Sequence, residues 1–417
     1  EKDESFQSPL LYHFDLSKEG YFYRIGQLNR AIGKFSEAQT FLMQASLLEP
    51  SNTKYLKALC DAYYVGLDFD HALDSCENQS QLRNSNQNSD PDQFELLCNK
   101  AEIALIRGDI ESTRSIEKVF KGNSNFLNAR CFAVLAQIAA HQNKSEEARS
   151  FLTKAEQVYQ ESLSNQTTHT LEVLFREVMT LNSLAEAFAR SGDKRKALDY
   201  HQNALNKLGN QPLINWRYVL NITEAAENQQ IAEEISLVTH APGKDLLSDK
   251  YHSKAQDKAE GLADYLTQKD FMCLKARITS AFIGKWPLSL SADACLANPE
   301  EAAAVILGTD DNDYAQKIAD SYLDHPRVLQ AYGVFALRNK RKDGLAYIEK
   351  ALQMDISNPI FHALFAKLST NDLESALNSI ETALSFWPDE PGWHAMASDY
   401  LTRMGNLEKA SQHISHA

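Results

Sequence analysis

The stretch that decides the fold lies at residues 25–50 and reads IGQLNRAIGKFSEAQTFLMQASLLEP. Its apolar residues recur with a helical period on both sides of Gly33, which predicts two amphipathic helices over about residues 20–32 and 35–48. Gly33 falls at the turn between them, where a positive φ is easily reached. Pro50 stops the second helix. The stretch therefore predicts one antiparallel helix pair.

The same pattern returns along the whole chain. Its second helices carry a small residue, a large one four positions later and another small one three positions after that. Further copies run over Leu56–Ala72, Leu97–Gly108, Phe132–Ala155, Leu184–Ala204, Trp216–Ala232, Gly344–Ala351, Ala376–Ala383 and Trp393–Ala417. Because one helix pair cannot bury its apolar face alone, copies at this spacing are expected to stack on one another.

In the first copy, small residues stand at Gly26, Ala38 and Ala45, and a proline at Pro50. In spacing and residue type this resembles the tetratricopeptide repeat, whose unit is about 34 residues long. The resemblance implies an all-α fold: a right-handed superhelical solenoid of antiparallel helix pairs. It also implies a binding protein, because the first helices of such repeats line a concave face.

The repeat pattern divides the chain into four segments. Residues 1–18 show no helical period and are expected to form an N-terminal arm or cap. Residues 19–242 are expected to hold about six repeats, and residues 301–417 about four, the last one truncated. Between them, residues 243–300 have an apolar composition typical of helices but contain no clear copy of the repeat pattern. We therefore expect an irregular helical connector there.

Composition agrees with a helical repeat protein. Only 16 Gly and 11 Pro occur among 417 residues, which argues against turn-rich β folds. The net charge of −14 and the absence of a dominant basic stripe argue against nucleic-acid binding. The longest apolar runs have about six residues, far short of the roughly 20 that span a bilayer, and no signal peptide is visible. With no initiator Met and an unfinished last repeat, we interpret the chain as a piece of a longer protein.

Helical periodicity also predicts which polar side chains line the concave face. They lie beside the buried positions of the first helices but point the other way, and form a mixed-charge surface suited to hydrogen bonding with a partner peptide or helix. These residues are Tyr23, Gln27, Arg30, Lys57, Asp61, Glu102, Gln137, His141, Asn182, Glu186, Arg217 and Asn221. A solvated face without a ligand is the alternative.

The six cysteines stand singly, without a CxxC pair, so zinc-ribbon and thioredoxin-like chemistry is unsupported. Buried free thiols and disulfides both remain open. By the family resemblance, Cys60 and Cys76 occupy facing positions of one helix pair, which makes a disulfide feasible. Cys273 and Cys295 are close enough in sequence for a disulfide to cross-link the irregular segment. Disulfides would indicate an oxidising compartment, and without them the compartment stays open.

The sequence shows no catalytic motif: no P-loop, no GxSxG and no HExxH. The acidic run at Asp310, Asp311 and Asp313 lacks the glycine and distal glutamate of a calcium loop, so no metal or cofactor is expected. We therefore predict a non-enzymatic scaffold or adaptor that binds a protein partner. A recruiting or regulatory region of a larger enzyme or cell-envelope assembly is the alternative, and a carbohydrate- or lipid-handling component is a third.

Overall fold

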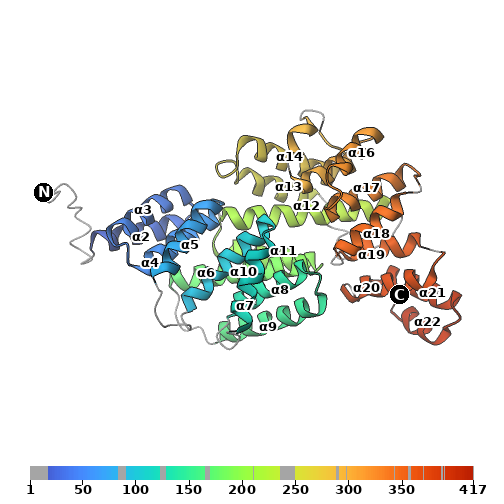
Figure 1. Ribbon diagram of the computed structural model, residues 1–417, viewed down its shortest axis with the longest axis horizontal. Helices are drawn as coiled ribbons and strands as arrows, with labels where there is room; N and C mark the ends of the chain where they lie inside the picture. Colours follow the sequence, from blue (N-terminus) through green and yellow to red (C-terminus); the bar gives the residue numbers. More distant parts are fainter. Residues whose placement is uncertain are drawn as a thin grey trace. The chain divides into compact units, whose positions relative to one another are not determined.

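The computed structural model describes residues 17–416 except 83–90, 123–127, 165–169, 210, 235–248, 288–290, 297, 342, 356–357, 370, 387 and 389. Every regular element in these residues is a helix (Figure 1), which confirms the all-α prediction. The chain divides into two compact units. Unit 1 comprises Glu1–Ile138, Ser150–Leu184 and Tyr200–Asn215, and unit 2 comprises Ala139–Arg149, Ala185–Asp199 and Trp216–Ala417.

Three helix pairs lie entirely in unit 1. Their helices are α2 (Lys18–Ala31), α3 (Phe35–Leu48), α4 (Thr53–Val65), α5 (Phe69–Leu82), α6 (Pro91–Arg107) and α7 (Ile110–Gly122). The first helices of successive pairs are neighbours, α2 beside α4 and α4 beside α6. The residues expected as an N-terminal arm lie outside the described part, apart from Ser17 and Lys18, with which α2 starts.

Local chemistry explains the limits of the first pair. The Ser17 side chain caps α2 by accepting a hydrogen bond from the Gly20 amide at 3.3 Å. Gly33 has a φ of 80°, as the turn between α2 and α3 requires. Ala38 and Leu42 of α3 are completely buried. The small residues of the repeat pattern therefore lie at the closest approach of the two helices.

Five helices contribute to both units: α8 (Ala129–His141), α9 (Ser145–Ser164), α10 (Leu171–Arg190), α11 (Lys194–Lys207) and α12 (Pro212–Glu234). α9 and α10 each have 20 residues, and this length accounts for the stretched spacing of the repeats in this region. α12 is one continuous helix of 23 residues, where the repeat pattern predicted a helix pair over Trp216–Ala232. No glycine or proline follows Pro212 within α12 to start a turn.

In unit 2, α13 (Asp249–Glu260), α14 (Gln268–Ile283) and the 3-10 helix η2 (Ala292–Cys295) occupy the segment without a clean repeat. Helix pairs follow in α15 (Pro299–Gly308), α16 (Asn312–Asp320), α17 (Pro326–Arg338), α18 (Gly344–Met354), α19 (Pro359–Leu368), α20 (Leu373–Phe386), α21 (Pro391–Arg403) and α22 (Leu407–Ile414). Their apolar faces form one core cluster, whose largest completely buried side chain is Trp393.

Two disulfides are present in the described residues. Cys60 of α4 is joined to Cys76 of α5 within unit 1, and Cys273 of α14 is joined to Cys295 of η2 within unit 2. The Cα atoms are 5.4 and 5.5 Å apart, an ordinary separation for bridged cysteines. Cys98 and Cys131 are buried free thiols whose Sγ atoms lie 3.2 Å apart.

We predict that Gly26→Ala destabilises unit 1 by about 1–3 kcal/mol, the usual cost of overpacking a core. A Cβ at Gly26 would lie 2.6 Å from Leu42 Cγ, so α2 and α3 would have to separate. In an exposed helix the same change would instead stabilise by roughly 1 kcal/mol. Thermal unfolding followed by circular dichroism measures the effect. Gly209→Ala is the control, because a Cβ there meets no atom within 4 Å. An unchanged or raised midpoint for Gly26→Ala would contradict the close approach.

Alkylation followed by mass spectrometry tests the disulfides. In denaturant without reductant we expect two labelled cysteines, Cys98 and Cys131, and after reduction all six. Peptide mapping identifies the bridged pairs. Six labels without reductant, or a bridge between Cys98 and Cys131, would refute the pairing.

Candidate functional site

The twelve polar residues expected on the concave face do not form one site. Eight of them belong to unit 1, and the other four, His141, Glu186, Arg217 and Asn221, belong to unit 2. In unit 1, five surround a pocket of about 210 Å³: Tyr23, Gln27, Arg30, Lys57 and Asp61. The remaining three unit 1 residues, Glu102, Gln137 and Asn182, are completely buried or nearly so.

The rest of the pocket wall comes from residues that the sequence pattern did not single out. They are Lys54, Ala58, Glu95, Arg130, Glu172, Phe175, Arg176 and Met179. Four of these share one face of α10, at positions 172, 175, 176 and 179. That helical spacing is visible in the sequence. The surface that this face of α10 contacts is not visible in the sequence, because its partners lie 81 to 149 residues earlier in the chain.

The first half of α10 covers the polar faces of α2, α4 and α6. The Tyr23 hydroxyl donates to Glu172 Oε1 at 2.9 Å, and Lys54 Nζ pairs with the same oxygen at 2.7 Å. The Arg30 guanidinium lies 3.8 Å above the Phe175 ring. Arg176 pairs with Glu95 at 2.5 Å. The face expected to be an open groove is therefore closed in part by the chain itself.

Below the pocket, the Glu102 carboxylate organises a buried network. Its oxygens accept hydrogen bonds from the Tyr64 hydroxyl at 2.8 Å, Arg130 Nη2 at 2.9 Å, the Ser183 hydroxyl at 2.7 Å and Gln137 Nε2 at 3.3 Å. Glu102 has no exposed surface and Gln137 is 1% exposed. Both had been expected on an accessible face. The structure corrects this: α8 and α10 cover Glu102, and Gln137, on α8, donates to Glu102 and to the Ser183 carbonyl of α10.

The two buried arginines of unit 1 differ in how their charge is balanced. Burial works to lower the pKa of Arg130, but the attraction of Glu102 outweighs it and raises that pKa overall. For Arg30, burial prevails over the attraction of Asp61, and the pKa is lowered. The nearest oxygen of Asp61 is 3.6 Å from Arg30 Nη1, beyond hydrogen-bonding distance. Arg30 Nε is buried without a hydrogen-bond partner.

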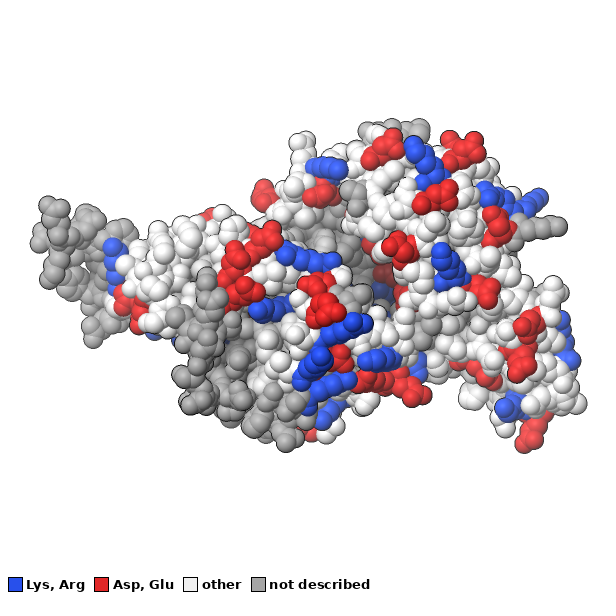
Figure 2. All heavy atoms as spheres, viewed as in Figure 1, with Lys and Arg blue, Asp and Glu red and all other residues white. Residues whose placement is uncertain are grey.

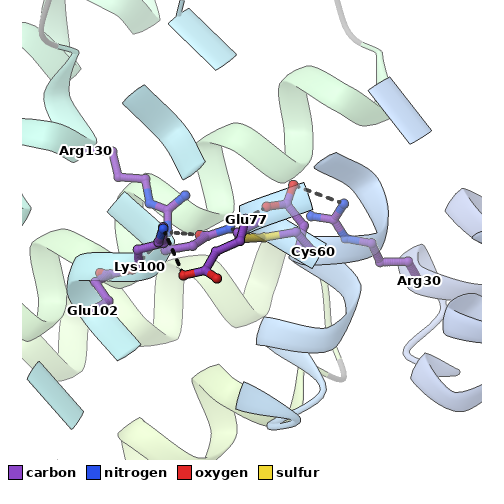
Figure 3. Close-up of a disulfide and its surroundings, with 9 residues drawn as sticks. Arg30, Cys60, Glu77, Lys100, Glu102 and Arg130 are labelled. Carbon is purple, nitrogen blue, oxygen red and sulfur yellow. Dashed lines mark hydrogen bonds and ion pairs between the residues drawn. A yellow bond between two sulfur atoms is a disulfide. The ribbon is translucent and has the colours of Figure 1, made fainter. Parts of the chain in front are cut away.

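A chain of side chains links these arginines (Figure 3). Arg130 Nη2 donates to Asn99 Oδ1 at 2.6 Å, and Asn99 Nδ2 donates to Asp61 Oδ1 at 2.8 Å. Asn99 Nδ2 also lies 3.4 Å from Cys60 Sγ, so the disulfide adjoins the network. Figure 3 shows Arg30 and Arg130 on either side of Cys60, with Lys100 next to Glu77.

In unit 2 the expected concave residues mostly contact one another. Asn221 Nδ2 donates to Glu186 Oε1 at 3.0 Å, and Arg217 Nη1 lies 3.8 Å from Glu186 Oε2. Lys194 reaches Asn221 and also pairs with Glu224 at 2.8 Å. Arg217 and Asn221 are buried, whereas His141 is exposed. These side chains form an internal cluster.

Charges of both signs are interleaved on the visible face of the molecule (Figure 2). In the residues covered by the structure, no three His, Cys, Asp or Glu side chains are grouped so that they could hold a metal ion. None of the described helices has the length and apolar character needed to cross a bilayer.

We predict that Glu102→Gln destabilises unit 1 by about 3–5 kcal/mol, the usual result of breaking a buried ion pair. The amide would leave the Arg130 charge uncompensated and would direct an N–H towards groups that are already donors. Denaturant unfolding measures the loss. Glu111→Gln is the control, since Glu111 is 89% exposed and its pair with Arg114 is long, so a change below about 1 kcal/mol is expected there. Equal effects of the two variants would contradict the network.

One family model matches the chain, over its first helix pair. Residues 20–52, which include most of α2 and all of α3, match the tetratricopeptide repeat model. No curated protein sequence matches the chain. Yeast Tom70 is 10% identical at a TM-score of 0.35, over 95% of this chain and 90% of its own. A monomeric IFIT1 mutant with Gppp-AAAA is 14% identical at a TM-score of 0.38, over 98% and 83% respectively. Residues 20–52 therefore form a tetratricopeptide repeat, the first of the helix pairs that the structure describes.

Proposed function

We propose that this chain is a non-enzymatic scaffold that binds a segment of a partner protein at the pocket of unit 1. A single observation carries the proposal: the pocket has an accessible charged rim above a buried polar floor. The rim side chains Lys54, Glu172 and Arg176 are 56, 52 and 49% exposed. The floor contains Gln27, Arg30 and Glu95, which are 7% exposed or less.

This division suits recognition of a protein segment. Buried polar groups that fixed helices hold in place lose little freedom on binding, so they can confer specificity at low entropic cost. Exposed rim charges act mainly on the rate of encounter and on the choice of partner. Ion pairs within the chain, such as Lys54 with Glu172 and Arg176 with Glu95, fix the positions of these charges at the pocket.

The experiment is a pull-down with the immobilised chain, followed by identification of the retained protein and measurement of its affinity for variants. Lys54→Glu is expected to weaken binding of that partner by about five- to tenfold, because it reverses one rim charge. The control is Lys118→Glu, an exposed lysine on α7 away from the pocket.

The outcomes separate two conclusions. Weaker binding by Lys54→Glu alone supports the pocket as the binding site. Equal binding by both variants would place the partner elsewhere on the chain. If no protein is retained at moderate salt, the scaffold proposal itself fails.

A further inference from the structure

We propose that the pocket of unit 1 binds an acidic side chain of the partner segment, with its carboxylate on Arg30 and the adjacent peptide N–H on Gln27. The inference rests on the proposed function and specifies its ligand. It follows from two buried polar atoms of opposite type in residues that line the pocket, from the charges of the pocket wall and from the pocket's size.

Arg30 is the donor of this pair. Three other buried guanidinium groups hydrogen-bond to a carboxylate: Arg130 to Glu102 at 2.9 Å, Arg277 to Glu227 at 3.1 Å, and Arg327 also to Glu227. Arg30 has only the 3.6 Å ion pair with Asp61 and the stack on Phe175, and its Nε has no partner. A buried charge that makes no hydrogen bond to its counter-ion is costly. A ligand carboxylate at Arg30 would relieve that cost.

Gln27 is the acceptor. Its Nε2 donates to the Tyr23 hydroxyl at 2.8 Å, while its Oε1 is buried without a hydrogen-bond partner. A peptide segment with an acidic side chain offers both missing groups, a carboxylate for Arg30 and a backbone N–H for Gln27. Leaving such groups unpaired is expensive, so a ligand that pairs both gains selectivity over one that pairs neither.

The balance of charge favours one negative charge. The pocket wall holds five Lys and Arg and three Asp and Glu. One carboxylate, Glu95, is shared by Lys57 and Arg176, which leaves a local excess of positive charge. A multiply charged phosphate at Arg30 would be repelled by Asp61, the carboxylate nearest to it.

Size and wall chemistry agree with a side chain. About 210 Å³ is less than the roughly 300–1,000 Å³ of pockets for drug-sized ligands. Ala58, Phe175 and Met179 supply apolar wall for the methylene groups of an acidic residue.

The test uses the full chain with ¹⁵N-labelled arginine. The probes are N-acetylglutamic acid α-amide, its neutral analogue N-acetylglutamine α-amide, and inorganic phosphate. The Nε–H signal of Arg30, assigned from its loss in Arg30→Lys, is expected to shift saturably with the glutamic acid probe and not with the glutamine probe. Equal shifts with both, no shift with either, or a shift with phosphate alone would overturn the proposal.

Variants test whether the partner captured in the pull-down binds at Arg30. Arg30→Lys keeps the charge but removes Nε, and is expected to weaken partner binding at least about tenfold. Should that variant fail to fold, Lys54→Met reports on the rim next to Arg30, with Lys118→Met as its matched control. Partner binding that depends on Lys54 but is unaffected by Arg30→Lys and by the glutamic acid probe would refute the acidic ligand while leaving the scaffold function intact. If the Arg30 signal responds to the probe but no protein is captured, the acidic site stands and the scaffold function fails.

Discussion

The arrangement of unit 1 depends on the buried carboxylate of Glu102. A charge removed from water must be surrounded by donors, and Glu102 obtains them from Tyr64 of α4, Arg130 and Gln137 of α8, and Ser183 of α10. Hydrophobic contacts between repeat helices are non-directional and would allow sliding, whereas these hydrogen bonds have fixed lengths and angles. The carboxylate therefore sets the register of α4, α8 and α10 around α6, and with it the shape of the pocket above.

The network is compensated in charge at its Glu102–Arg130 end, whereas at its other end Arg30 makes no hydrogen bond to its counter-ion Asp61. From Glu102 it passes to Arg130, through Asn99 to Asp61, and ends at Arg30. Each link but the last is a hydrogen bond of 2.9 Å or less. Asp61 already accepts from Asn99, so it compensates Arg30 only at longer range. The least satisfied charge of the network consequently lies where the pocket begins, and this position is the basis of the proposed role in recognition.

Sequence periodicity predicted the local structure well and the long-range contacts poorly. Gly26, Ala38 and Ala45 mark close helix contacts because spacing within one helix pair is set by the helical period. The contact of α10 with α2 has no such signal, since it joins Tyr23 to Glu172 across 149 residues. Periodicity also does not show where a helix pair is replaced by a single helix. For α12 a different signal was present: a run without glycine or proline from Leu213 to Glu234.

Unit 2 contains a comparison for the pocket network. Glu227 of α12 pairs with both Arg277 and Arg327, and Glu300 lies next to the same two guanidinium groups. Burial lowers and the carboxylates raise the pKa of each arginine, with a net rise for both. A cluster compensated in this way gains little from a further anion, and its role is to hold helices together. At the Arg30 end of the unit 1 network the nearest carboxylate, Asp61, lies 3.6 Å away, beyond hydrogen-bonding distance, and the proposed acidic ligand rests on this difference between the two clusters.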